Sequence, residues 1–232
     1  MKKKISFVIS ALMMLSCVSI NNSIATAEEI VVQVANYTDF ERAIAEPNVI
    51  GIEVVGDITA TDNLGIINRG IEFYGNNVTI DGNGKDGLKF SVPSTLSSPI
   101  IGGAINFINF NSERGAVIYN QDSTIITYIE GIFKNNTATK FGGAIYNGGT
   151  INIVADTQDT TFTGNTANGI SNALYNGGTT NLNAGDYKIT FNDGIDGYRS
   201  STEYAKININ KDFGDDLPTN GLEYNGQIKI SS

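Results

Sequence analysis

The side chains that could carry chemistry in this chain are acidic and basic, because imidazole is absent. The sequence contains no histidine and a single cysteine, Cys17. Catalytic triads that depend on histidine, and metal sites built from imidazole, are therefore excluded. One adjacent carboxylate pair, Asp215 and Asp216, remains as a candidate for acid–base catalysis. Two consecutive side chains normally point apart, so we interpret this pair as part of a solvated loop.

A second candidate is a calcium loop at residues 81–87, which is rich in acidic and amide oxygens. The segment resembles an EF-hand loop, but Lys85 and Asp86 occupy positions that need an oxygen ligand and a glycine. Val92 stands where the bidentate glutamate would be required. A tight turn between two strands is therefore the favoured interpretation. We expect no metal site and no cofactor.

A repeated segment contains the tyrosines and asparagines that are the remaining candidate residues. Residues 133–153 return 29 positions later as residues 162–182, with 11 of 21 aligned positions identical. Residues 115–120 form a weaker copy, 27 positions upstream of the matching part of the first repeat. A period of this length predicts stacked supersecondary units, which bury their apolar faces against one another.

Short apolar segments alternate with turn residues along the chain, which indicates an all-β protein. The expected strands are 30–34, 49–55, 64–67, 70–74, 78–80, 88–92, 104–110, 116–119, 124–129, 143–146, 150–154, 161–162, 179–182 and 188–191, with one more pair at 222–230. A coil of three strands and three turns fits the repeat and predicts a right-handed parallel β-helix, with coils about 4.8 Å apart. Leucine-rich repeats lack their regular leucines here, and a propeller blade would need about 40 residues.

The turns of this helix are expected at clusters of asparagine, aspartate and glycine, which tolerate positive φ. These clusters are residues 76–77, 81–84, 147–149 and 176–178. The glycine pairs that begin at Gly142, Gly148 and Gly177 are interpreted as turns and not as phosphate loops, because no helix with a Gly-Lys-Ser/Thr signature follows them.

Stacking of the coils would place equivalent residues in columns. Side-chain amides at one turn could hydrogen-bond to the coils above and below, in a column formed by Asn120, Asn147 and Asn176. The preceding position carries an aromatic column formed by Tyr119, Tyr146 and Tyr175. These tyrosines form either an exposed ladder suited to sugar stacking or a structural stack on one face of the coil. We favour the structural stack.

One helix is expected near the start of the mature chain. Thr38 and Glu41 have the spacing of a capping box, in which both side chains bond to backbone N–H groups at a helix start. Phe40, Ala43 and Ile44 follow at helical spacing, and Pro47 closes the segment. Such a helix would cap the end of the β-helix and cover its hydrophobic core.

The first 27 residues have the layout of a secretory signal peptide. Lys2, Lys3 and Lys4 precede an apolar stretch at 5–18 and a small-residue cleavage site at 25–27. The apolar stretch is shorter than the roughly 20 residues of a membrane span, and Cys17 lies in a poor lipidation motif. We therefore expect a signal peptide at 1–27 and a β-helix domain at 28–232. The mature chain would have no membrane span.

Removal of the three lysines would leave 12 basic and 24 acidic residues, a formal charge of −12. This charge repels nucleic acid and anionic membranes, so neither is an expected partner. The simplest role of the charge is to keep an exported protein soluble.

The repeat resembles a known family. Residues 133–136 and 142–145 look like the paired F-x-x-N and G-G-A-[ILV] motifs of polymorphic outer-membrane proteins, which are autotransporters with β-helical passengers. Residues 162–165 keep the first motif, while 171–174 are a degenerate copy of the second. Residues 186–195 are also similar to recurring passenger segments, and residues 78–84 resemble the opening coils of pectate-lyase-like β-helices generally.

This resemblance implies an exported, non-enzymatic protein that acts in adhesion or display at the bacterial cell surface, in the outer membrane or after secretion. Its partners would be host-cell or surface glycans and proteins, besides the export machinery. The chain shows no run of ten-residue membrane strands before Ser232, so a truncated product, a small secreted relative or anchoring by another chain all remain open. The alternative function is a polysaccharide lyase or hydrolase that uses aspartates and one arginine, from Arg42, Arg69, Arg114 or Arg199.

Overall fold

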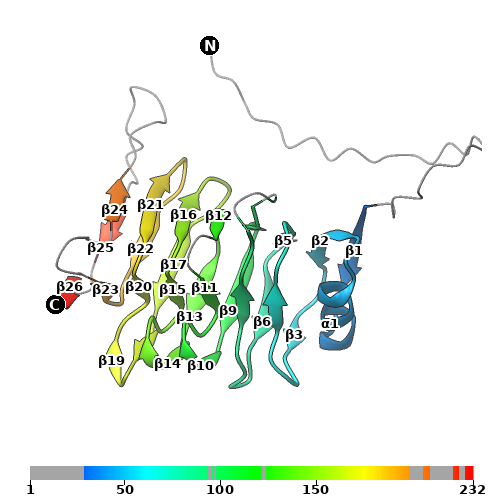
Figure 1. The fold of residues 1–232 in the computed structure, drawn as a ribbon, viewed down its shortest axis with the longest axis horizontal. Helices are drawn as coiled ribbons and strands as arrows, with labels where there is room; N and C mark the ends of the chain where they lie inside the picture. The colour runs from blue at the N-terminus through cyan, green and yellow to red at the C-terminus, as the bar shows by residue number, and fades with distance from the viewer. Residues whose placement is uncertain are drawn as a thin grey trace, which may run out of the picture.

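The computed structural model describes residues 29–93, 96, 98–121, 124–198, 206–209, 222–224 and 228–231. Parallel strands stack along the long axis, and a single short helix lies at the N-terminal end of the stack (Figure 1). The predicted all-β parallel β-helix is therefore confirmed, as is the presence of one short helix. In the described residues, no helix combines the length and apolar character that crossing a bilayer requires.

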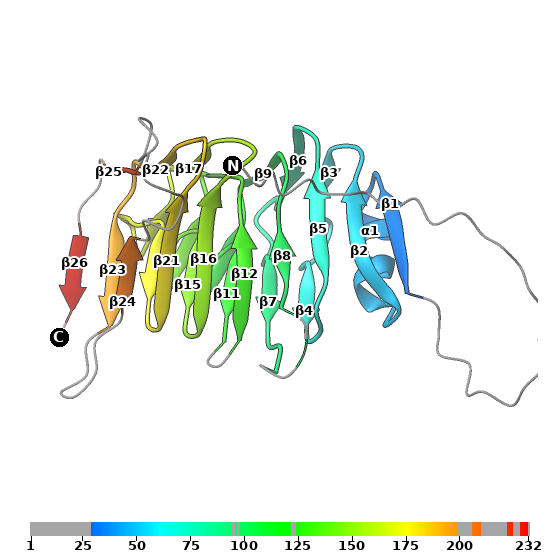
Figure 2. The ribbon, with the colours of Figure 1, turned by 90° about the horizontal axis from the view of Figure 1, so that it is seen from above.

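Three long sheets, named A, B and C here, form the walls of the β-helix. Sheet A contains, in order across the sheet, β1 (Ile30–Val34), β2 (Val49–Val54), β5 (Glu72–Gly75), β8 (Ile100–Ile101), β12 (Ile125–Ile129), β16 (Thr150–Ala155), β21 (Thr179–Ala184) and β24 (Lys206–Ile209). Figure 2 shows these strands side by side in sequence order. Sheet B contains β3 (Ile58–Thr59), β6 (Val78–Asp81), β9 (Ile105–Ile108), β13 (Ile132–Lys134), β17 (Thr160–Thr163), β22 (Ile189–Phe191) and β25 (Leu222–Tyr224).

Sheet C completes each coil, and a short sheet D is inserted between sheets B and C in the middle of the stack. Sheet C contains β4 (Gly65–Ile67), β7 (Leu88–Phe90), β11 (Ile118–Asn120), β15 (Ile145–Asn147), β20 (Leu174–Asn176), β23 (Ile195–Tyr198) and β26 (Ile228–Ser231). Sheet D contains β10 (Asn111–Arg114), β14 (Thr137–Phe141), β18 (Thr166–Ala167) and β19 (Ile170–Ser171). Only the β18–β19 pair is antiparallel among the pairings of the described strands.

The interior is a continuous apolar core in which like residues stack on like. Phe107, Phe133, Phe162 and Phe191 form one column, with ring centroids 5.4, 4.8 and 4.4 Å apart and exposures of 1% or less. Two of these rings are the phenylalanines of the F-x-x-N motifs, so the first position of that motif faces the core. Parallel register produces such columns, because each coil adds one residue of the same type directly above the last.

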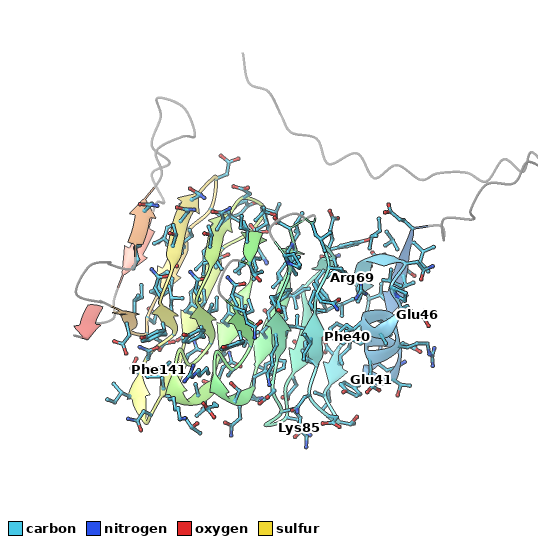
Figure 3. The ribbon with its side chains drawn as sticks, viewed as in Figure 1. Phe40, Glu41, Glu46, Arg69, Lys85 and Phe141 are labelled. Atoms are coloured by element: carbon cyan, nitrogen blue, oxygen red, sulfur yellow. The ribbon has the colours of Figure 1, made fainter. Side chains whose placement is uncertain are left out.

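Helix α1 (Tyr37–Ala45) covers the N-terminal end of the core. Its buried residues are Tyr37, Phe40, Ala43 and Ile44. The Phe40 ring, labelled in Figure 3, lies 5.9 Å from the ring of Phe73 in sheet A. These residues recur every three or four positions and form one apolar face of the helix. This face covers the core, as expected for a capping helix.

The expected capping box at Thr38 is wrong, because the N-cap lies two residues earlier. Asn36 is the N-cap: its Oδ1 accepts a hydrogen bond of 3.0 Å from the backbone N–H of Asp39. The Asn36 amide also donates to the Asp39 carboxylate at 2.8 Å. Asn36 and Asp39 have the same spacing as Thr38 and Glu41. The helix starts at the first pair, because this start allows Tyr37 to be buried as the first residue of α1.

The C-terminal end of α1 is closed by Arg69, which comes from the connection after β4. Its guanidinium donates to the carbonyl oxygens of Ala43, Ile44, Glu46 and Val49 at 3.3, 2.9, 3.0 and 3.2 Å. Three of these carbonyls belong to the last turn and cap of α1, where helix carbonyls have no partner within the helix. Arg69 therefore ties the helix to the first coil (Figure 3).

Strand bounds differ from the expected ones by a few residues, and the sequence-based list lacks sheet D and also β3, β8, β13, β20, β23 and β24. The expected turns at 147–149 and 176–178 are present as bends between β15 and β16 and between β20 and β21, but they do not use positive φ. No glycine at 147–149 or 176–178 has positive φ, whereas Asn77, Asn83 and Gly84 do. Gly149 and Gly178 are required for another reason: a Cβ there would lie 2.2 Å and 2.0 Å from a backbone oxygen of the preceding coil.

Candidate binding surface

The outward face of sheet C carries the three tyrosines of the predicted column. Strands β11, β15 and β20 pair in register, so Tyr119 lies beside Tyr146 and Tyr146 beside Tyr175. The ring centroids are 5.0 and 5.2 Å apart, at interplanar angles of 16° and 7°. The flanking side chains of the same strands point inward and are buried, so the tyrosines lie on the outer side of the coil.

This stacking decides what the tyrosines can offer to a ligand. Tyr146 has a neighbouring ring on each of its faces, and Tyr175 is only 8% exposed. A sugar stacks on the face of an aromatic ring, and the inner faces of this column are already covered. The column can therefore present ring edges and polar tips, but it cannot act as a row of sugar-stacking platforms.

A second column lies beside the tyrosines, on sheet D. Arg114 of β10 and Phe141 of β14 are directly paired residues. The Phe141 ring lies 4.6 Å from the Tyr175 ring at 41°, and it is 38% exposed. The guanidinium carbon of Arg114 lies 5.6 Å from the centroid of Phe141 and 5.7 Å from that of Tyr146. Contacts of this length are cation–π interactions and hold the guanidinium in place.

We name the five residues Arg114, Tyr119, Phe141, Tyr146 and Tyr175 the aromatic patch. Figure 3 shows Phe141 beside the strands of sheet D, at the part of the stack remote from α1. Beyond β14 and β18 on the same sheet, Ile170 of the hairpin strand β19 is 52% exposed. The patch is thus the junction between the outer faces of sheets C and D.

The charges around the patch leave Arg114 without a hydrogen-bonded acid. Lys140 donates to the Glu113 carboxylate at 3.0 Å, which lowers the pKa of Glu113. Lys89 donates to Asp86 at 2.7 Å. The Arg114 Nε lies 3.6 Å from the Glu113 carboxylate, which is longer than a hydrogen bond. This Nε is buried and has no hydrogen-bond partner.

The predicted amide column lies inside the coil, directly next to the tyrosines. Asn120 donates to Asn147 at 2.8 Å, and Asn147 donates to Asn176 at 2.9 Å; all three side chains are fully buried. The Asn120 Oδ1 is buried without a partner. The structure gives the reason: the paired residue of the preceding coil is Phe90, which has no amide to donate.

A second interior column was not predicted from the sequence. Asn136 donates to Asn165 at 2.9 Å, and Asn165 donates to the Asp193 carboxylate at 2.7 Å. Asn136 and Asn165 are the last residues of the two F-x-x-N motifs, so that motif places a phenylalanine and an amide inside the coil. Asp193 also accepts bonds from the backbone N–H groups of Gly164 and Asn165, both at 2.9 Å.

Sequence analysis also missed the buried carboxylate of Glu130. It accepts hydrogen bonds from the backbone N–H groups of Asp156 and Thr157 at 2.7 and 2.8 Å, and one from the Thr157 hydroxyl. Burial and the nearby Glu130 charge raise the pKa of Tyr128. Both buried carboxylates, Glu130 and Asp193, are therefore occupied by structural hydrogen bonds. Neither takes part in an ion pair among the described residues.

The other candidate residues are dispersed. Arg42 lies on the exposed side of α1, 3.1 Å from Asp39, and Arg69 caps that helix. The segment 81–87 is a turn after β6, where the Asp81 carboxylate accepts from the Asn83 N–H at 2.8 Å; Figure 3 labels Lys85 in this turn. Arg199, Asp215 and Asp216 lie outside the described residues.

The described side chains show no metal cluster. Among them, no group of three or more acidic, histidine or cysteine residues is arranged to hold a metal ion. A surface depression of about 440 Å³ lies between α1 and β4, lined by residues that include Glu41, Ile44, Ile66 and Arg69. Arg69 donates four hydrogen bonds to carbonyl oxygens there. We therefore interpret this depression as the boundary between the helix and the first coil, and not as a ligand site.

Comparison with known proteins agrees with this arrangement. A family model described as "putative pectate lyase-like adhesive domain" matches residues 31–227. No curated protein matches the chain significantly, and no solved structure does so. The matched residues cover nearly the whole β-helix, and the chain belongs to the family of pectate lyase-like adhesive domains.

Proposed function

We propose that this chain is an exported, non-enzymatic β-helix that acts in adhesion at the bacterial cell surface. The observation that carries the proposal is the family match over residues 31–227, because that family is described as adhesive. The arrangement of charges supports it: the buried carboxylates of the described residues bond to the backbone, and Arg42, Arg69 and Arg114 lie on separate elements. A lyase or hydrolase of related fold needs its acids and its arginine in one groove.

The mechanism we propose is binding by the outer surface of a rigid stack. Side chains of one type recur at each coil, so a ligand with its own repeat can meet several equivalent positions at once. Several weak contacts then give a high overall affinity, because once the first contact has formed, the later ones form within the same protein–ligand complex. The outer amides of Asn152, Asn181 and Asn208, which bond to one another at 2.7 and 2.8 Å, are one such column.

Purified residues 28–232, coupled to beads, would test this function. We expect these beads to attach to host-cell layers or matrix-coated surfaces more than beads coated with the heat-unfolded chain. The same preparation should release no unsaturated or reducing-end products from polygalacturonate. Attachment equal to the unfolded control, or steady product release, would contradict the proposal.

The cellular location is a separate part of the proposal. A signal peptide at 1–27 and the resemblance to autotransporter passengers both support export, to the cell surface, the outer membrane or the medium. An immunoblot of cells, outer membranes and medium, with antibody to residues 133–182, would test it. A band of mature size in the medium favours a free secreted domain. A larger band confined to the outer membrane favours an anchored passenger, and a band only inside the cell contradicts export.

A further inference from the structure

We propose that the aromatic patch recognises the carboxylate of an acidic sugar at the end of a glycan, with Arg114 as the residue that binds it. This inference rests on the proposed adhesive function and names the ligand class of one of its surfaces. The starting observation is that the Arg114 guanidinium has aromatic neighbours but no hydrogen-bonded acid.

Two aromatic rings hold Arg114 in position, and its one ion pair among the described residues, with Glu113, is long and contains no hydrogen bond. Its guanidinium carbon lies 5.6 and 5.7 Å from the centroids of Phe141 and Tyr146. A planar guanidinium fixed against aromatic rings keeps its donors in a rigid fork. The nearest acid, Glu113, is 3.6 Å from the Nε and is already bonded to Lys140 at 3.0 Å. The Arg114 side chain is 37% exposed, so an external ligand can reach it.

A carboxylate fits this arrangement better than other ligand groups. Arginine and carboxylate form two parallel hydrogen bonds, which are short and charge-assisted. Of the nearby cations, Lys89 and Lys140 already donate to Asp86 and Glu113. Arg114 is therefore the cation of the patch that remains available for a new anion.

The rest of the patch favours a sugar over an acidic peptide. The Phe141 ring is 38% exposed beside Arg114 and can take the C–H face of one sugar ring. The tyrosine column continues the surface along the stack axis, with rings about 5 Å apart. Their inner faces are covered, so further sugar rings would meet ring edges and polar tips there.

The overall charge restricts the ligand to one carboxylate or a few. The mature chain has a formal charge of −12 by its sequence, which repels a polyanion. A single carboxylate at a glycan end feels mainly the local guanidinium, since more distant charges are screened beyond about 8 Å at physiological salt. The site would therefore prefer a terminal acidic sugar to a long acidic polymer.

The experiment measures binding of residues 28–232 to four surfaces. Two carry oligosaccharides that end in glucuronate or N-acetylneuraminate. The third carries the glucose-terminated counterpart of the glucuronate surface, and the fourth a glutamate-rich peptide. We expect at least about ten-fold tighter binding to one acidic-sugar surface than to the glucose surface and the peptide.

Variants then assign the effect to Arg114. Arg114→Gln should lower acidic-sugar binding to the level of the glucose surface. Arg42→Gln removes an exposed arginine on α1 and should bind as the unchanged chain does. Phe141→Leu keeps an apolar side chain, and Arg114→Lys keeps the positive charge. Each variant should bind the acidic sugar several-fold more weakly than the unchanged chain, and its melting temperature should be unchanged.

The inference would be overturned by equal binding to the glucose surface, by equal binding to the peptide, by binding that survives Arg114→Gln, or by no binding to either acidic sugar. These results are distinct from failure of the adhesive function. Beads that attach to cells without a preference for acidic sugars would remove this inference and leave the adhesive function standing.

Discussion

Asn147 donates a hydrogen bond of 2.9 Å from its side-chain nitrogen to the side-chain oxygen of Asn176, its paired residue in the next coil. Both side chains are fully buried, and Asn147 also accepts from Asn120 and from the N–H of Gly149. A buried amide must satisfy its donors and acceptors within the protein. The column does this by repetition, since each coil supplies the partner that the previous one needs.

We expect Asn147→Ala to lower the free energy of unfolding by about 2–4 kcal/mol, because it leaves buried groups of both neighbouring coils unpaired. Urea unfolding followed by circular dichroism would measure this loss. Asn181→Ala is the matched control: its amide column lies on the outer face, where water can replace the lost partners, and its cost should stay below about 1 kcal/mol. Equal losses in both variants would mean that burial of the column is unimportant.

Two adjacent glycines should respond very differently to an added methyl group. A Cβ at Gly178 would lie 2.0 Å from the carbonyl oxygen of Gly149, whereas at Gly177 the nearest atom would be 3.3 Å away. We expect Gly178→Ala to cost about 3 kcal/mol or more and Gly177→Ala less than about 1 kcal/mol. The same unfolding experiment compares them. Similar stability of the two variants would show that the coils are not in this close contact.

The helix cap depends on Arg69. Arg69→Ala removes three hydrogen bonds to carbonyl oxygens at the end of α1 and one to Val49 of β2, and we expect it to destabilise that end by about 2–3 kcal/mol. Amide exchange should become faster throughout α1 while sheet C keeps its protection. Arg42→Ala, which loses one exposed ion pair, should leave the exchange of α1 nearly unchanged. Uniform acceleration over the whole chain would contradict a local capping role.

The pH dependence of stability should include a contribution from Asp156. Burial, together with the charges of Glu130 and Asp186, raises the pKa of this carboxyl. A raised pKa in the folded state means that the ionised carboxylate costs stability at neutral pH, and that this cost is absent below the unfolded-state pKa of about 3.9.

Asp156→Asn should therefore raise the melting temperature at pH 7 by about 1–2 °C, with no gain at pH 3. The side chain is exposed, so solvent screening keeps the gain small. Glu41→Gln, which removes an exposed negative charge on α1, controls for the change in net charge. A gain that persists at pH 3 would show that ionisation of Asp156 is not its cause.

The tyrosine column and the amide column beside it could be predicted because parallel pairing repeats the same residue type at a constant offset. Tyr146 and Tyr175 are 29 residues apart in the sequence and adjacent in space. The pair Arg114 and Phe141 could not be found in this way: the two residues are also directly paired, but their types differ and leave no repeat signal. Asp193 was missed for a related reason, since it lies 28 and not 29 residues after Asn165.

Sheet D was missed because its strands are short and polar, and alternation of apolar residues is the signal by which strands are recognised. Strand β10 has the sequence Asn-Ser-Glu-Arg and ends at Arg114. The helix start was misplaced because Asn36 and Thr38 both satisfy the local capping pattern. Only the burial of Tyr37 against the first coil distinguishes them.

Adhesion by the cells that produce this chain tests the central claim most directly. A strain that lacks this chain would be compared with strains restored with the unchanged chain or with the Arg114→Gln variant, and adherent cells would be counted on a host-cell layer. We expect deletion to lower adherence, the unchanged chain to restore it, and the variant to restore it only in part. Adherence of the deletion strain equal to that of its parent would contradict an adhesive function for this β-helix.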